Sequence, residues 1–263
     1  MNLQVLVSTM HQASNVYSLL DKMNIQSDAI VINQCDRNHF EKLNYKGHAI
    51  LYLSFNERGV GLSRNNALMR ATADICLFAD DDVRYVDGYH EIVMREYKEH
   101  PDADVIVFNV PSTNPERGTP EIKKWHRLRF YNCLRYGTYQ FSIRTKSIHK
   151  ANIYFSLLFG GGARYSAGED SLFVMDCIRK GLKVYASPLI IGTVTHNEST
   201  WFRGYNDKYF IDKGALYEAM TPTYSKLMSL QFCLRHRNMF KKDKKWWEAF
   251  NLMLRGINEY KEQ

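Results

Sequence analysis

In Phe78-Ala79-Asp80-Asp81-Asp82-Val83, three consecutive carboxylates follow the apolar run 75–78, and this is the most informative segment of the sequence. A short apolar run bounded by polar residues is typical of a buried strand. Acidic residues at the end of such a strand lie at the carboxyl edge of the sheet, where open α/β sheets bind their ligands. Two carboxylates one residue apart can hold Mg²⁺ or Mn²⁺ while substrate phosphates complete the shell. A solvated acidic turn is the alternative interpretation of the triplet taken alone.

Composition limits the class of protein. With 263 residues, of which 45% are hydrophobic, the chain can form one large domain, or one and a half, with a sizeable core. No apolar run approaches the length of a transmembrane helix, and the N-terminus enters a strand-like run at once, so we expect no signal peptide. The five cysteines are odd in number and lack metal-ligand spacing, which predicts reduced core residues of a cytosolic protein.

Outward from the triplet, strand and helix patterns alternate. Strands are predicted over residues 3–8, 29–32, 49–53, 75–78 and 105–110. Helices are predicted over residues 15–23, from a cap at Ser63 through Ala71, over 89–99 and over 171–180. This alternation predicts a largely parallel, doubly wound α/β sheet.

Beyond residue 110 the pattern changes. Residues 111–120 are rich in Pro, Thr, Asn and Gly and are predicted to form a loop, and Gly160-Gly161-Gly162 opens a flexible segment. That segment ends at Gly168-Glu169-Asp170, directly before the last predicted helix, where the helix dipole favours an ionised carboxylate. The alternative is that Asp170 only caps the helix.

Three motifs in this order resemble the family-two glycosyltransferases, which are inverting enzymes with the GT-A fold. The first motif is Gly59-Val60-Gly61-Leu62-Ser63-Arg64-Asn65-Asn66-Ala67-Leu68, the second is the Asp triplet, and the third is Gly168-Glu169-Asp170-Ser171-Leu172-Phe173. The resemblance covers about residues 3–201. It implies a Rossmann-like mixed sheet flanked by helices, a glycosyltransferase domain over 1–200 with a nucleotide-sugar half (1–110) and an acceptor half (111–200), and a C-terminal helical extension over 201–263.

The resemblance also implies a metal-binding side of the site. Asp82 matches the acid that coordinates a Mn²⁺ or Mg²⁺ ion on the donor diphosphate, and Asp80 matches the acid that contacts ribose or the metal shell. Asp81 is a donor-binding neighbour with a weaker claim. His196 follows a later strand-like run and is a further candidate metal ligand, with an ordinary structural role as the alternative.

On the donor side, Arg64 matches a basic residue of the donor pocket, and Thr9 and Asp36 fall where these enzymes hold the nucleotide base. The chain departs from the family here, because Asn33-Gln34 stands in place of the usual paired acids after the second strand. The identity of the nucleotide therefore stays open.

On the acceptor side, Asp170 matches the catalytic base, with Glu169 beside it. Trp201 can stack on a sugar ring, with core packing as the alternative. The chemistry is consistent with these residue types. A divalent ion neutralises the leaving diphosphate, and a positioned carboxylate deprotonates the attacking hydroxyl. Gly160 to Gly162 is expected to close over the bound donor.

The C-terminal part carries most of the charge asymmetry of a chain whose formal net charge is +7. Residues 235–245 hold six Lys/Arg and one Asp, and the apolar residues of 246–257 recur on one helical face. One interpretation is a helix packed on the body of the domain. The other is that 235–257 rests on an anionic membrane surface. No nucleic-acid-binding signature accompanies the basic residues, so nucleic acid is not an expected partner.

Together, these features and the family resemblance predict a cytoplasmic, metal-dependent, inverting glycosyltransferase, which in the membrane interpretation of 235–257 is peripheral at the inner face of the membrane. The resemblance implies a nucleotide-diphosphate sugar as donor and, with the basic C-terminus, a glycan or lipid-linked glycan of a bacterial surface polysaccharide or capsule as acceptor. One alternative is a nucleotidyltransferase, but Ser8–Gln12 lacks the Gly and Lys/Arg that its phosphate loop needs. The other is a non-catalytic carbohydrate- or lipid-binding protein on the same scaffold, against which the three intact aspartates Asp80, Asp82 and Asp170 argue.

Overall fold

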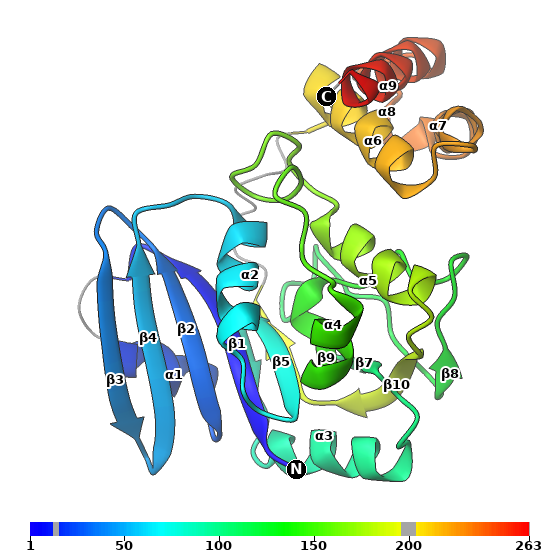
Figure 1. The fold of residues 1–263 in the computed structure, drawn as a ribbon. Coiled ribbons are helices and arrows are strands. Elements are labelled where there is room, and N and C mark those ends of the chain that lie inside the picture. The colour runs from blue at the N-terminus through cyan, green and yellow to red at the C-terminus, as the bar shows by residue number, and fades with distance from the viewer. Residues whose placement is uncertain (13–15, 196–203, 263) are drawn as a thin grey trace.

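The computed structural model describes residues 1–12, 16–195 and 204–262 (Figure 1). The strands are β1 (Leu3–Met10), β2 (Asp28–Gln34), β3 (His39–Tyr45), β4 (His48–Phe55), β5 (Ile75–Asp80), β6 (Val83–Tyr85), β7 (Val105–Asn109), β8 (His126–Arg127), β9 (Phe141–Arg144), β10 (Val184–Ile190) and β11 (Gly192–Val194). The helices are α1 (Val16–Met23), α2 (Val60–Arg70), α3 (Tyr89–Glu99), the 3-10 turn η1 (Thr138–Gln140), α4 (Thr145–Ala151), α5 (Glu169–Arg179), α6 (Asp207–Met220), α7 (Ser225–Arg235), α8 (Arg237–Phe240) and α9 (Trp246–Lys261).

Nine of the strands form one mixed sheet in the order β3-β4-β2-β1-β5-β9-β7-β10-β8. Strands β4, β2, β1 and β5 are parallel, as the alternation of strand and helix patterns predicts. Strand β9 lies antiparallel between β5 and β7, and β3 and β8 are antiparallel edge strands. The prediction of a largely parallel sheet is therefore wrong for half of the strand pairs, whereas the mixed sheet implied by the family resemblance is confirmed.

Helices cover both faces of the sheet (Figure 1). Along β1, Val5 and Val7 point to the face that α1 and α3 cover, and Leu6 points to the face covered by α2, α4 and α5. All three side chains are at most 1% exposed, because adjacent residues of a strand point to opposite sides and both sides are covered. Burial of each such side chain stabilises the fold by about 1.5–3 kcal/mol.

Helix starts and one edge strand differ from the sequence prediction. Helix α2 begins after Gly59, and Ser63 lies inside it, buried, with its hydroxyl donating to Ser8 Oγ at 3.0 Å; the predicted cap at Ser63 is therefore wrong. Helix α5 begins at Glu169, two residues earlier than predicted. Strand β3 was not predicted, because most of its residues are exposed and it lacks an apolar face.

The helices α6, α7 and α9 enclose a separate apolar cluster that includes Phe210, Phe240 and Met253. In Figure 1 these helices lie together at one end of the molecule, next to the segment that leads into α5. The predicted packing face of α9 is partly wrong: Met253 and Ile257 are buried, but the side chains of Trp246 and Trp247 are exposed.

Two further findings bear on sequence-based expectations. All five cysteines are free and buried, which confirms their assignment as reduced core residues. Within the described part of the chain, no helix combines the length and the apolar character needed to cross a membrane.

Candidate functional site

The parallel register of β1 and β5 brings Thr9 and the Asp triplet to the same edge of the sheet. Ser8 pairs with Asp80, the last residue of β5, so Thr9 lies where the chain turns through Asp81 and Asp82 toward β6. The Thr9 hydroxyl donates to Asp81 Oδ2 at 2.5 Å, and the backbone carbonyl of Asp82 accepts a hydrogen bond from the N–H of Thr195 at 3.2 Å. The predicted acidic turn is therefore folded against neighbouring elements, which excludes a freely solvated turn.

One buried guanidinium joins the three sequence motifs. From α2, Arg64 donates through Nη2 to Asp80 Oδ1 at 2.9 Å and through Nη1 to Glu169 Oε1 at 2.8 Å. The Arg64 side chain is only 6% exposed, and a buried charge of this kind requires oppositely charged partners with good hydrogen-bond geometry. Burial by itself would lower the pKa of Arg64, but the charges of Asp80 and Glu169 outweigh burial and hold it above its ordinary value.

Three phenylalanines form the floor below this ion-pair network. Phe155 stacks on Phe173 of α5 with 4.2 Å between ring centroids, and Phe78 of β5 meets Phe155 edge-on at 5.1 Å. The Arg64 guanidinium lies 5.5 Å from the centroid of the Phe155 ring. The apolar floor lowers the local dielectric, so the charges above it interact more strongly than they would in water.

Asp170 lies in the first turn of α5 and is not its cap. The N-cap is Gly168, in a left-handed conformation with φ 115°, and Asp170 Oδ1 accepts from the backbone N–H of Ser171 at 2.6 Å. Burial, and secondly the negative charge of Glu169, raise the pKa of the half-buried Asp170 carboxyl to about 7. The N-cap position of α5 therefore belongs to Gly168, and Asp170 bonds one N–H of the first turn, so a role of Asp170 at the helix end and a role as a base both stay open.

Tyr139 of η1 is a site residue that sequence reasoning missed. Burial raises the pKa of its phenol well above the ordinary value, and the negative charges of Asp80, Asp82 and Asp170 raise it further. The charges of Asp80 and Asp82 at the end of β5 and of Asp170 in the first turn of α5 therefore all act on the Tyr139 side chain. No local signal identifies Tyr139 in the sequence, because only the tertiary fold places η1 next to the end of β5.

Asn65 was also missed as a structural part of the site. Its side-chain amide donates to the carbonyl of Phe155 at 2.9 Å and accepts from the N–H of the same residue at 2.8 Å. Helix α2 and the segment that contains Phe155 lie close together here, since a Cβ added at Gly61 would lie 2.3 Å from the carbonyl oxygen of Ser156. A polar residue on the buried face of a predicted helix is the signal that identifies such a position.

Two side chains shape the region predicted to hold the nucleotide base. Asn33 is fully buried and pairs with both the N–H and the carbonyl of Gln12, at 3.0 and 3.1 Å. Gln12 in turn donates to Thr9 Oγ1 at 2.9 Å. Asp36 follows β2 and is exposed, and β1 lies between β2 and β5, which ends at Asp80. The predicted residues His196 and Trp201 lie outside the described residues.

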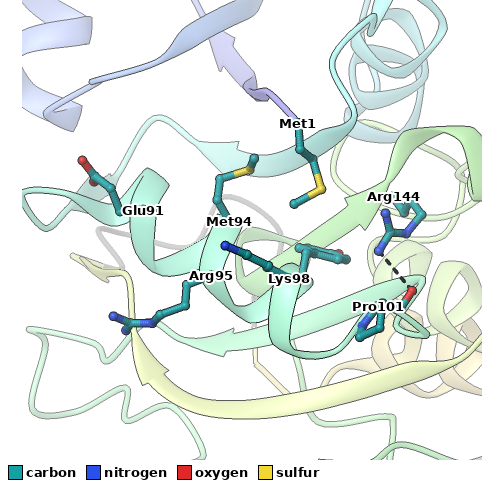
Figure 2. A pocket seen from close by; sticks show the side chains of 8 residues that line it. Met1, Glu91, Met94, Arg95, Lys98, Pro101 and Arg144 are labelled. Atoms are coloured by element: carbon teal, nitrogen blue, oxygen red, sulfur yellow. Dashed lines mark hydrogen bonds between the residues drawn. The ribbon is translucent and has the colours of Figure 1, made fainter.

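Two other places on the molecule do not match the predicted site. A surface hollow lined by Met1, Met94 and Arg144 lies at the opposite, amino-terminal edge of the central strands (Figure 2). Among the described residues, one group brings three candidate metal ligands within 4.8 Å of one another: Glu96, Glu99 and His100 at the end of α3. Neither place contains a residue of the three sequence motifs.

The Arg64 network yields a prediction about stability. Arg64→Lys keeps the charge but replaces the planar fork of a guanidinium with a single nitrogen, so it cannot reproduce both bonds, to Asp80 and to Glu169, in their present geometry. We expect the free energy of unfolding to fall by about 1.5–3 kcal/mol, the usual contribution of a hydrogen bond to a charged group. Chemical denaturation measures this, with Arg70→Lys on the same helix as the control, since Arg70 bonds Asn66 of α2 and lies over the Phe55 ring but is not part of a carboxylate bridge. Equal losses in both variants would contradict the bridging role.

Solved structures similar to this chain share its fold. The structure of S. aureus TarS residues 1–349 in complex with UDP-GlcNAc aligns with 98% of this chain and 82% of that chain, at 18% identity and a TM-score of 0.65. The complex of the same protein with UDP aligns over the same shares at 16% identity and a TM-score of 0.63. A comparison with curated protein sequences gives no match.

The family follows from the sequence of the N-terminal half together with this fold. The sequence model described as "Glycosyl transferase family 2" matches residues 14–158, which is more than half of the chain. The matched range contains the glycine-rich Arg-Asn motif and the Asp triplet. In the folded chain, Arg64 of the first motif also bonds Glu169 of the Glu-Asp pair in α5. The chain therefore belongs to glycosyl transferase family 2.

Proposed function

We propose that this glycosyltransferase moves a sugar, with inversion, from a nucleotide-diphosphate donor to a hydroxyl of a glycan or lipid-linked acceptor. The observation that carries the proposal is that Arg64 bonds two carboxylates from different sequence motifs. Asp80, on the Asp triplet, and Glu169, next to Asp170, bond the same guanidinium. A donor held at the triplet is thus brought toward a carboxyl whose pKa is raised to about 7.

For the donor, we assign Thr9, Asp36, Arg64, Asp80 and Asp81 as binding residues. The carboxyl edge of parallel strands is the usual ligand-binding edge of such sheets. TarS, whose fold is similar, has been solved with UDP-GlcNAc and with UDP. In this protein Arg64 is already paired with two carboxylates, so its contribution to donor binding is to hold Asp80 in place.

The side chains at the triplet are compatible with a divalent metal. Carboxylate oxygens are the ligands that Mg²⁺ and Mn²⁺ prefer, and we assign Asp82 as a direct ligand, with His196 as a second candidate. The negative charges that raise the pKa of Tyr139 are charges that a bound cation would compensate. When bound, the metal would neutralise the charge that develops on the leaving diphosphate.

For the transfer itself, we assign Asp170 as the general base. Its carboxylate takes the proton of the acceptor hydroxyl as that oxygen forms a bond to the anomeric carbon, and the bond from that carbon to the diphosphate oxygen breaks. Attack from the face opposite the diphosphate inverts the anomeric centre. A base is most effective when its pKa lies near the working pH, and the raised pKa of Asp170 meets this requirement.

The decisive variant is Asp170→Asn, which keeps the shape of the side chain but cannot take a proton. We expect kcat to fall by about two to four orders of magnitude, the usual contribution of a positioned base, with donor affinity retained in calorimetry. In the wild type, kcat should rise as pH increases through about 7, because the base must be deprotonated. Glu169→Gln should move this rise to lower pH, since the charge of Glu169 raises the pKa of Asp170. Unchanged turnover of Asp170→Asn would exclude Asp170 as the base.

The metal assignment is tested separately with Asp82→Asn. We expect Mn²⁺ to raise the melting temperature of the wild type in the presence of nucleotide sugar, because a ligand that binds only the native state stabilises it by mass action. The variant should lose most of this Mn²⁺-dependent shift and its turnover. Asp81→Asn is the matched control, since Asp81 bonds Thr9 and should retain the Mn²⁺-dependent part of the shift. Transfer by Asp82→Asn that persists in a chelator would refute the assignment.

We further propose that the acceptor is a bacterial surface polysaccharide, such as a capsule, and that the protein works at the cytoplasmic face of the membrane. The support for the membrane part of this proposal lies in 224–247, where exposed apolar side chains alternate with exposed cations. The exposed apolar residues are Tyr224, Leu227, Leu234, Met239, Trp246 and Trp247. The exposed cations are Lys226, Arg235, Arg237, Lys241, Lys242 and Lys245. Tryptophans and cations together are typical of helices that lie on anionic membranes.

Membrane binding is tested with the triple variant Lys241→Ser, Lys242→Ser and Lys245→Ser. Lys244 is left intact, because its Nζ lies 2.5 Å from Asp207 Oδ1 and the ion pair belongs to the fold. We expect the wild type to sediment with vesicles of phosphatidylglycerol and phosphatidylcholine and to be released by about 1 M salt, at which charge attraction is screened within about 3 Å.

The triple variant should stay in the supernatant. The matched control removes three exposed cations elsewhere, at Lys98, Lys146 and Lys150, and should sediment like the wild type. Equal sedimentation of the triple variant and the wild type would contradict a membrane role for this region.

A further inference from the structure

The helix α6 holds the loop before α5 through one buried carboxylate. Asp212 is 7% exposed, and its Oδ2 accepts hydrogen bonds from both the backbone N–H of Ser166, at 2.8 Å, and the Ser166 hydroxyl. Lys208 Nζ lies 2.8 Å from both carboxylate oxygens of Asp212 and donates to the carbonyl of Arg164 at 2.8 Å. A carboxylate buried to this degree is tolerated only when its charge is paired and its oxygens are bonded, so this contact favours a single geometry.

A second contact of α6 lies two residues closer to the candidate base. A Cβ at Gly168 would come within 2.5 Å of Leu216 Cδ1, so α6 packs directly on the backbone of the residue that caps α5. The carbonyl of Gly168 accepts the N–H of Leu172, which is the hydrogen bond that starts α5. The position of α6 therefore fixes where the turn that carries Glu169 and Asp170 begins.

The helix α6 can serve as a fixed support because it is packed closely against α9. A Cβ at Gly214 would lie 2.0 Å from the carbonyl oxygen of Met253, and one at Gly256 would lie 1.9 Å from that of Ile211. Glycine at both positions allows the two helix backbones to touch. Both helices lie beyond residue 158, where the match to the family model ends.

We infer that Asp212, together with Lys208, is a positioning residue for the base, so that the C-terminal helices are part of the catalytic unit. The inference rests on the proposed function of Asp170. Asp212 does not touch the reacting atoms; it acts through Ser166 and the loop that ends at Gly168. Misplacement of a reacting group by about 1 Å can reduce a rate by about 10²-fold, so a modest shift of this loop is enough to impair transfer.

The chain supplies matched controls on the same helix. Glu218 is also a buried carboxylate of α6, 4% exposed, and it accepts from the Ser225 hydroxyl at 2.5 Å and pairs with Lys261 at 3.5 Å. These partners lie on α7 and α9 and not on the loop before α5. Asp212→Asn is therefore compared with Glu218→Gln, and Ser166→Ala with Ser225→Ala. Each pair removes the same chemical group, but only the first member of each pair touches the loop.

The expected result is a change in kcat without a change in donor KM. Asp212→Asn should lower kcat by about 10- to 100-fold. Ser166→Ala, which keeps the backbone N–H, should lower kcat several-fold, and both should keep the donor KM within about twofold. Hydrogen exchange of the Leu172 amide should become faster in these two variants only. The controls Glu218→Gln and Ser225→Ala should leave kcat and this amide unchanged, even where their melting temperatures fall.

Several outcomes would overturn the inference. Equal losses of kcat in the control pair would mean that general destabilisation causes the effect, and unchanged kcat in Asp212→Asn and Ser166→Ala would mean that the contact has no role in transfer. If Asp212→Asn does not fold, Ser166→Ala against Ser225→Ala decides. An active Asp170→Asn variant would refute the base assignment and this inference together, whereas an inactive Asp170→Asn beside a fully active Asp212→Asn would refute the inference alone.

Discussion

The buried ion pairs of Arg64 are the interaction on which the site depends. The guanidinium comes from α2, its two carboxylate partners come from β5 and α5, and 105 residues separate Arg64 from Glu169 along the chain. Because each carboxylate is fixed by the same planar group, the spacing between the end of β5 and the start of α5 is set by the width of one side chain. A lysine or an apolar residue could not impose that spacing, since only a guanidinium presents parallel donors in a rigid fork.

Next to this network, the backbone of 155–161 lies close to α2. Asn65 pairs with both backbone groups of Phe155, and the N–H of Val60 donates to the carbonyl of Gly161 at 2.9 Å. The segment 155–162 is therefore bonded to the start of α2, and the glycines there make close approach feasible. In this conformation the segment is anchored, so closure over a donor, as proposed from the run of glycines, would require these contacts to break.

The C-terminal helices join this arrangement through the loop before α5. Helix α6 holds the loop before α5 through Asp212 and packs on Gly168, and it also carries Lys213, whose pKa is lowered by burial while the charge of Asp170 opposes that shift. Lys213 Nζ lies 4.8 Å from the centroid of the Phe232 ring, which links it to α7. The C-terminal helices thus carry the exposed basic surface of 224–247 and also contact the start of α5. The proposed membrane contact and the proposed catalysis would therefore share these helices.

Elements with local signals could be predicted from the amino-acid sequence. The apolar run 75–78, the three ordered motifs and the helix pattern of 89–99 were sufficient to predict β5, α3, the α/β class and the acidic edge, because these signals lie in neighbouring residues. The tertiary structure alone decided which charges meet. The sequence did not show that Arg64 bridges two carboxylates, that the charges of the site act on Tyr139, or that Asp212 bonds the loop before α5, because nothing near these residues in the sequence marks the contacts. The physical reason is that ion pairs and pKa shifts depend on distance and burial between elements far apart in the chain, and these are fixed only when the sheet, α5 and α6 have packed.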